Sequence, residues 1–87
     1  MAEIILVGVE LLSEPLRKWV TTTFGEMAET FSEGLSITIS IYANKTVEIS
    51  DLESSQDHDE ADVYEFTDAI SCACAYIART LQAPILH

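Results

Sequence analysis

The clearest pattern of hydrophobic and polar positions is a strict alternation in the middle of the chain. Residues 35–41 read Leu-Ser-Ile-Thr-Ile-Ser-Ile, the two-residue period of a β-strand with one buried and one wet face. Residues 43–45 (Ala-Asn-Lys) predict a tight turn, because Asn tolerates a positive φ angle. A second strand follows over residues 46–50, with Val47 and Ile49 pointing inward. The pattern therefore predicts a β-hairpin.

Hydrophobic residues recur every three or four positions on both sides of this hairpin, which predicts two helices. The first runs from about residue 14 to residue 33, and Gly34 is placed to end it. The second runs over about residues 59–82, with Asp57 or Asp59 as its N-cap. The apolar positions are Leu16, Val20, Phe24, Met27 and Phe31 in the first helix, and Val63, Phe66, Ile70, Cys74 (or Ala73), Ile77 and Leu81 in the second.

Three further segments complete the expected order of elements. Residues 3–9 are apolar and rich in β-branched side chains, as in a strand covered on both faces. Residues 51–58 are polar and turn-like, and Ile85-Leu86 is a candidate for a short final strand. The order β-α-β-β-α, with or without that strand, is that of a ferredoxin-like or split βαβ sandwich. We therefore expect residues 1–87 to form one α+β domain, with both helices on one face of a mainly antiparallel sheet.

Charge adds the most informative feature. The 87 residues include 15 acidic and 4 basic side chains, which gives a formal net charge of −11. The stretch from Glu48 to Asp68 holds nine carboxylates and no Lys or Arg. Such a field attracts cationic surfaces and repels nucleic acid and anionic membranes. The nine residues, which we expect to bind a partner, are Glu48, Asp51, Glu53, Asp57, Asp59, Glu60, Asp62, Glu65 and Asp68.

Stabilisation by the helix dipole explains only part of this cluster. It favours acidic residues at a helix N-terminus by about 0.3–1 kcal/mol each, which covers Asp57–Asp62. Glu65 and Asp68 lie beyond the first turn, and like charges at close helical spacing cost a few tenths of a kcal/mol. A solvated face and a binding surface both fit the cluster, and the absence of basic residues favours the binding surface.

The spacing of the charges on the second helix is similar to that of a nucleic-acid strand. Asp59–Asp68 covers about 13.5 Å of helix, and its five charges are about 3.4 Å apart along the axis. A single DNA strand presents charge at about the same linear density. In size, acidity and α/β character the chain resembles small phage-encoded inhibitors, including DNA mimics and anti-CRISPR proteins. The resemblance implies a viral protein that occupies a basic groove built for phosphates, in the cytoplasm of the host.

The two cysteines, Cys72 and Cys74, do not indicate a metal or redox site. Residues two apart on a helix point about 200° from each other, so their sulfurs do not converge on one ion. A structural zinc site needs four ligands, and only His58 and His87 are available to join them. The acidic run Asp57–Asp62 offers a loose site for a divalent cation, but it does not match the calcium-loop pattern. We expect two small core residues, no metal and no cofactor.

No catalytic arrangement is recognisable. Ser13, Ser71 and the Thr run at 21–23 have no matched histidine and acid that would make a nucleophile. The three glycines are isolated and form no phosphate-binding loop. We therefore expect a protein that is not an enzyme.

The second helix has one further feature. Residues 69–78 read Ala-Ile-Ser-Cys-Ala-Cys-Ala-Tyr-Ile-Ala, small or apolar nearly all round, and such a helix should be buried on every side. Either the first helix covers this segment closely, or the segment forms a homodimer interface. We expect the dimer, with an interface made of Ile70, Ala73, Cys74, Tyr76 and Ile77.

Together these patterns predict a non-enzymatic interaction protein of the cytoplasm. The N-terminal apolar run is short and lacks the basic region of a signal peptide. We expect the protein to bind and block the basic surface of a nucleic-acid-binding protein, without contacting nucleic acid or membrane itself. The alternative is a structural or assembly protein that oligomerises through its second helix, with acidic residues that serve solubility. Salt separates the two, because ionic strength weakens a charge-driven complex and not a packed oligomer.

Overall fold

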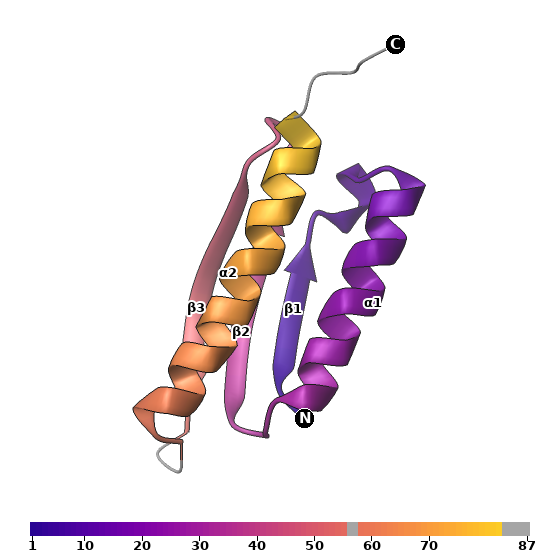
Figure 1. The fold of residues 1–87 in the computed structure, drawn as a ribbon. Helices are drawn as coiled ribbons and strands as arrows, with labels where there is room; N and C mark the ends of the chain where they lie inside the picture. The colour runs from indigo at the N-terminus through magenta and orange to yellow at the C-terminus, as the bar shows by residue number, and fades with distance from the viewer. Residues whose placement is uncertain (56–57, 83–87) are drawn as a thin grey trace.

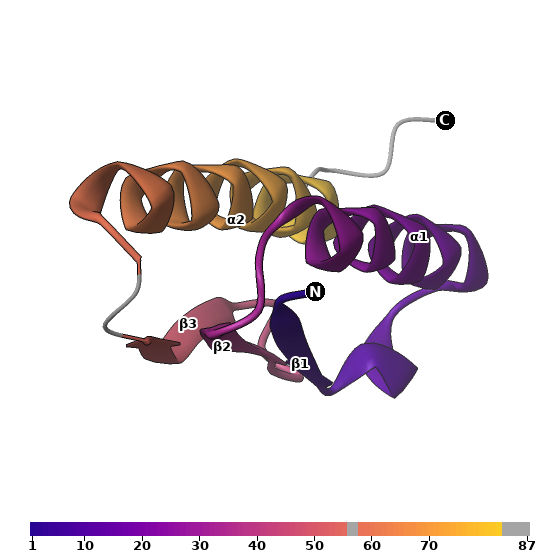
Figure 2. The same ribbon diagram turned by 90° about the horizontal axis from the view of Figure 1, so that it is seen from below.

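Both helices lie on the same face of a three-stranded sheet, so the domain has two layers (Figure 1). Figure 2 shows the helices side by side over the sheet. The computed structural model describes residues 1–55 and 58–82. The predicted α+β class and the order β-α-β-β-α are confirmed, whereas the strand predicted at Ile85-Leu86 lies outside the described residues. The elements are β1 (Glu3–Val7), a short 3₁₀ helix η1 (Val9–Leu11), α1 (Glu14–Thr30), β2 (Leu35–Ile41), β3 (Val47–Ser54) and α2 (Glu60–Gln82).

β2 is the central strand of the sheet. It pairs in parallel with β1, where Ile4 lies opposite Ile37, and antiparallel with β3, where Ile39 lies opposite Ile49. Because β1 and β2 are direct neighbours joined by α1, the first half of the chain is an undivided βαβ unit rather than a split one. The sheet is therefore mixed, with one parallel and one antiparallel pairing.

β2 also supplies the centre of the hydrophobic core. Its odd-numbered residues, which are all apolar, are buried, whereas its Ser and Thr side chains lie half-buried on the open face of the sheet. This is the alternation that predicts the strand. The helices complete the core with fully buried side chains, which are Val20 and Phe24 from α1 and Phe66, Ile70 and Ile77 from α2.

One face of the small and apolar stretch of α2 is covered within the single chain. Four of the five residues predicted to form a homodimer interface are core residues instead, at most 6% exposed. The fifth, Tyr76, packs its ring against that of Trp19 on α1. The sheet and α1 therefore cover those four side chains, which are not available to a second copy. Ser71, Cys72 and Ala75 on the outer side of the same stretch are exposed, and the homodimer through α2 stays a prediction. The four covered residues are Ile70, Ala73, Cys74 and Ile77.

Two predictions about strand boundaries are wrong. β1 ends at Val7 and is covered on one face only, because both helices lie on that face; Ile5 and Val7 lie on the opposite, open face and are 44% and 49% exposed. β3 does not stop at Ser50 but continues to Ser54 through a bulge, so part of the predicted turn is strand. The bulge contains one extra residue and Asp51 at φ 54°, a conformation that Asp adopts more readily than most residues.

No helix in the described part of the chain has the length and apolar character needed to cross a membrane. α1 ends at Thr30, three residues before its predicted end. Gly34 lies in the loop before β2 rather than at the helix end, with φ 93°. That loop meets the start of α2, and this contact positions the surface described next.

Candidate protein-binding surface

The structure places eight of the nine carboxylates of the 48–68 stretch, and all eight are exposed. Asp57 lies outside the described residues. Asp59 caps α2, since its side chain accepts a hydrogen bond from the backbone N–H of Asp62 at 2.9 Å. Within residues 1–55 and 58–82, none of the eight forms an ion pair with Lys or Arg. Three lie on β3 (Glu48, Asp51 and Glu53) and five at the start of α2 (Asp59, Glu60, Asp62, Glu65 and Asp68).

The basic side chains lie at the opposite end of the molecule. Arg17 and Lys18 are in the first turns of α1, and Arg79 is in the last turn of α2. Lys45 lies in the turn between β2 and β3, where its carbonyl accepts a hydrogen bond from the side chain of Gln82 at 3.3 Å. Figure 1 shows that the start of α1, the end of α2 and this turn share one end of the domain. Positive charge is therefore separated from the start of α2 along the long axis.

Glu48 belongs less closely to the acidic group than the other seven. It is the second residue of β3, so it lies next to the turn that carries Lys45. The hydroxyl of Tyr42 donates a hydrogen bond to its carboxylate at 3.3 Å. The structure thus brings the acids of α2 and the end of β3 together and leaves Glu48 towards the basic end.

Two acidic residues outside the 48–68 stretch join the acidic end. A hollow of about 460 Å³ is lined by Glu3 of β1, Glu33 after α1 and Glu53 of β3. Glu3 and Glu53 lie in one row across the sheet, because both pair with Ser36 of β2. Sequence reasoning missed this group, since it depends on which strands are neighbours; the parallel β1–β2 register is the signal that identifies it.

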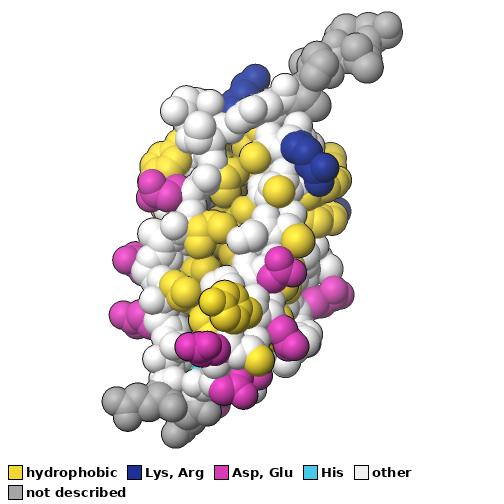
Figure 3. All heavy atoms as spheres, turned by 60° about the vertical axis from the view of Figure 1, so that its left-hand side comes forward, with side chains coloured by type: hydrophobic (Ala, Val, Ile, Leu, Met, Phe, Trp, Pro, Cys, Tyr) yellow, Lys and Arg dark blue, Asp and Glu magenta, His cyan; other side chains and the backbone are white. Residues whose placement is uncertain are grey.

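A second hollow, of about 410 Å³, lies between β3 and the first turns of α2, and we call it the β3–α2 groove. Leu52 and Tyr64 line it and are 44% and 71% exposed. Figure 3 shows hydrophobic side chains gathered along the middle of this face, with carboxylates on both sides. The surface thus combines apolar area with negative charge. The groove is lined by Leu52, Ser54, His58, Asp59, Glu60, Val63, Tyr64 and Thr67.

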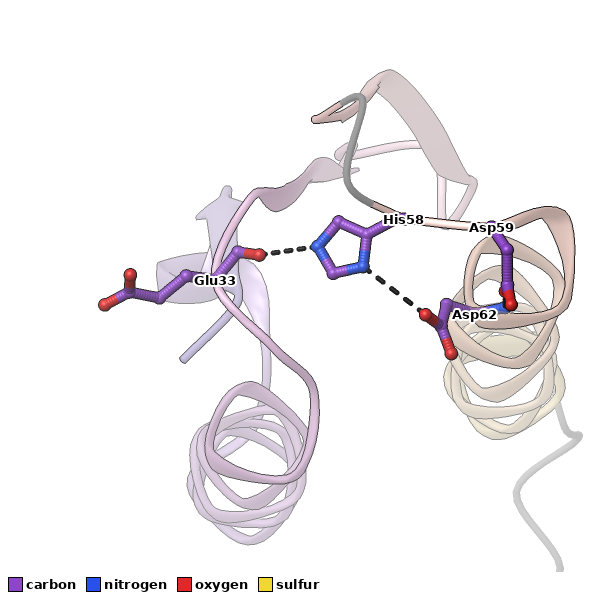
Figure 4. Close-up of polar contacts among 4 residues, drawn as sticks. All are labelled: Glu33, His58, Asp59 and Asp62. Atoms are coloured by element: carbon purple, nitrogen blue, oxygen red, sulfur yellow. Dashed lines mark hydrogen bonds and ion pairs between the residues drawn. The ribbon is translucent and has the colours of Figure 1, made fainter.

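His58 joins the start of α2 to the loop that follows α1 (Figure 4). Its Nε2 lies 2.5 Å from the backbone carbonyl oxygen of Glu33, and its Nδ1 lies 3.6 Å from a carboxylate oxygen of Asp62. The carbonyl oxygen can only accept, so Nε2–H is the donor of this hydrogen bond, whereas the Nδ1 contact is longer than a hydrogen bond. The side chain of His58 is only 7% exposed, so it is a structural contact beneath the acidic surface.

Gly34 is required for this close approach. A Cβ atom at this position would lie 2.5 Å from Oγ of Ser55 and 3.1 Å from Nε2 of His58. The backbone N–H of Ser55 also donates a hydrogen bond to the carbonyl of Gly34 at 2.8 Å. The loop before β2 therefore holds the end of β3 and the start of α2 at a fixed distance.

The cysteines differ in their surroundings. Cys72 is exposed, whereas Cys74 is buried, and burial raises the pKa of the Cys74 thiol to about 11. In the part of the chain that the structure describes, no three His, Cys, Asp or Glu side chains are grouped to hold a metal ion.

The chain was compared with protein-family models, curated proteins and solved structures. No protein-family model, curated protein or solved structure matches the chain. The candidate site is therefore defined by its own geometry: an apolar groove bordered by exposed carboxylates that have no Lys or Arg partner among the described residues.

Proposed function

We propose that this protein binds a basic surface of another protein and blocks it, and that the target surface is one that binds nucleic acid. The observation that carries the proposal is the exposure of all eight described carboxylates between Glu48 and Asp68, without an ion pair to Lys or Arg. A cationic surface would supply the missing counter-charges. It would also be drawn to this end of the molecule from a distance, because the basic residues lie at the other end.

Stability of the fold explains only part of this arrangement, namely Asp59 as the cap of α2 and the acids of its first turn. The core is formed by apolar side chains of β2, α1 and α2, and none of the acidic side chains is buried in it. Glu65 and Asp68 lie beyond the first turn of α2, so the helix dipole does little for them. Repulsion among these charges opposes folding slightly, and binding a cationic partner removes it.

The spacing of the charges supports a nucleic-acid-binding target. At the start of α2 the five carboxylates from Asp59 to Asp68 are on average about 3.4 Å apart along the helix axis, from a rise of 1.5 Å per residue. One DNA strand presents its phosphates at a similar interval of helix axis, about 3.4 Å per phosphate. A groove that binds phosphates would therefore encounter carboxylates at about the linear density of the phosphates of one DNA strand. The protein would act as a nucleic-acid mimic of the phage anti-defence kind.

The test is affinity capture from the native cell with three forms of the protein. Wild type is compared with Glu65→Lys/Asp68→Lys and with a control, Glu10→Lys/Glu14→Lys, whose changes lie at the basic end. Each Glu or Asp to Lys change adds two positive charges, so both double variants carry −7 instead of −11. We expect wild type and the control to capture a partner that is released by salt and by duplex DNA, and the Glu65/Asp68 variant to lose it. Equal capture by the Glu65/Asp68 variant, with an unchanged far-UV spectrum, would contradict the proposal.

A further inference from the structure

We infer that the β3–α2 groove is the docking site for a segment of the partner in which a large apolar or aromatic side chain is flanked by Lys or Arg. This inference rests on the proposed function and deepens it: it names the part of the acidic surface that recognises the partner and the chemistry of what enters it. The partner would not be held by charge alone.

The walls of the groove provide the apolar half of this recognition. Leu52 of β3 and Val63 and Tyr64 of α2 line a hollow of about 410 Å³, which lies within the range of roughly 300–1,000 Å³ typical of ligand sites. Tyr64 is the most exposed large hydrophobic residue in the described chain, at 71%. Tyr is, with Trp and Arg, one of the residues in which the energetically dominant positions of protein interfaces are enriched. A side chain entering from the partner would cover both Leu52 and Tyr64.

Carboxylates provide the anionic half of this recognition, which would bind the Lys or Arg flanks. Asp59 and Glu60 themselves line the groove. Further acidic residues of β3 and α2 border the apolar strip on its two sides (Figure 3). An apolar side chain in the groove would thus have carboxylates on either side of it, which is the arrangement that binds a segment with Lys or Arg on both flanks.

The same charges exclude the other candidate occupants. A second copy of the chain would bring its own net charge of −11 to the groove, and phosphates of nucleic acid or anionic lipid would also be repelled. A neutral apolar segment would leave the bordering carboxylates without counter-charges. Charge complementarity therefore selects a basic segment with an apolar anchor.

The groove is held open in the free protein. His58 fixes the start of α2 to the carbonyl of Glu33, and Asp59 caps the helix. Ser55, bound to Gly34, fixes the end of β3. Both walls are therefore held by hydrogen bonds within the chain, and a preformed site loses less free energy on binding than one that must first be ordered.

The experiment uses two synthetic peptides as probes. Both carry the same number of Lys residues; one has a central pair of Leu residues and the other has Ser in their place. Binding to the full chain is measured by fluorescence anisotropy at about 0.15 M salt, near physiological ionic strength. We expect wild type to bind the Leu peptide at least tenfold more tightly than the Ser peptide.

Variants then locate this preference. Tyr64→Ala, at an exposed helix position, should reduce the preference for the Leu peptide to less than threefold, and Leu52→Ser should do the same. The matched control is Ile5→Ser/Val7→Ser, which removes exposed apolar side chains from the open face of the sheet and should keep the full preference. Equal binding of the two peptides by wild type, or a preference unchanged in Tyr64→Ala, overturns the inference.

Charge reversal separates this inference from the proposed function. Glu65→Lys/Asp68→Lys should weaken both peptides by a similar factor. If it does so while wild type binds the Leu and Ser peptides equally tightly, the result supports binding by the acidic surface and contradicts docking in the β3–α2 groove. If wild type prefers the Leu peptide but charge reversal changes neither affinity, the result contradicts the proposed function. It also contradicts the inference that the docked segment must carry basic flanks.

Discussion

The ring of Trp19 on α1 lies 4.4 Å from the ring of Tyr76 on α2, centroid to centroid, with the two planes inclined by 37°. A second aromatic pair, Phe31 and Phe66, meets edge to face at 5.2 Å. Trp19 is near the start of α1 and Phe31 directly follows its end, so the two pairs hold the helices together at both ends of α1. The first helix thus packs against one face of α2 at two points.

Removal of the first aromatic pair should loosen the contact between the helices. We expect Trp19→Ala to lower the free energy of unfolding by about 2 kcal/mol, since the ring is partly buried. A double-mutant cycle with Tyr76→Ala should give a coupling energy of about 0.5–1.5 kcal/mol. Urea denaturation measures both values. Tyr64→Ala serves as the control, with a change within about 0.5 kcal/mol because that ring is exposed.

Ile70 tests whether α2 is a core helix of the single chain. Ile70→Asp places an unpaired carboxylate in the core and should cost several kcal/mol, a large share of the stability of a domain of this size. The loss should be the same at low and high protein concentration. A loss that shrinks as the protein concentration rises would instead assign Ile70 to an interface between copies. Light scattering of wild type at micromolar concentration tests the homodimer prediction itself.

Two glycines should respond in opposite directions to the same substitution. Gly34→Ala introduces a Cβ at φ 93°, 2.5 Å from Oγ of Ser55, so it should destabilise by more than about 1 kcal/mol. Gly25→Ala lies in α1 with open space around it and should stabilise by about 0.5–1 kcal/mol. Thermal unfolding of the two variants beside wild type checks the signs. Equal tolerance of both changes would mean that Gly34 does not hold the start of α2.

Cys74 gives the protein a dependence on alkaline pH. The pKa of its thiol is raised from 9.0 to about 11 by burial, so the unfolded chain loses this proton before the folded one. The contribution of the neutral thiol is thus fully present below pH 9 and is lost as the pH rises from about 9 towards 11. Cys74→Ala should flatten this part of the stability curve. At pH 8, a thiol reagent should modify Cys72 quickly and Cys74 only after unfolding; equal rates would contradict the burial of Cys74.

The sequence predicts those parts of the fold in which local pattern and tertiary packing agree. The alternation over residues 35–41 leads to β2 with its boundaries, because the central strand is buried on one face along its whole length. α2 is found within one residue of its predicted start, and Asp59 is one of the two caps that the sequence proposes. In both elements the hydrophobic period matches the face that the core covers.

The remaining differences between prediction and structure arise where contacts between residues distant in sequence determine the local structure. The bulge at Asp51 shifts the alternation of β3 by one residue, so residues 51–54 do not show a strand period. Ile5 and Val7 have the composition of a doubly covered strand but lie on the open face, which only the placement of both helices reveals. Likewise, Glu3 and Glu33 lie beside Glu53 in the folded chain. The three residues are far apart in the sequence, so no short segment of it predicts that they are neighbours.

The separation of the four basic residues from the start of α2 gives the domain a permanent electric dipole moment. In the field of a cationic surface, such a molecule rotates before it arrives, with the start of α2 and the end of β3 foremost. Association between proteins is slowed mainly by the need to present the right patch. A larger fraction of collisions would therefore begin in the productive orientation, and Arg17, Lys18, Lys45 and Arg79 contribute to this although they lie farthest from the partner.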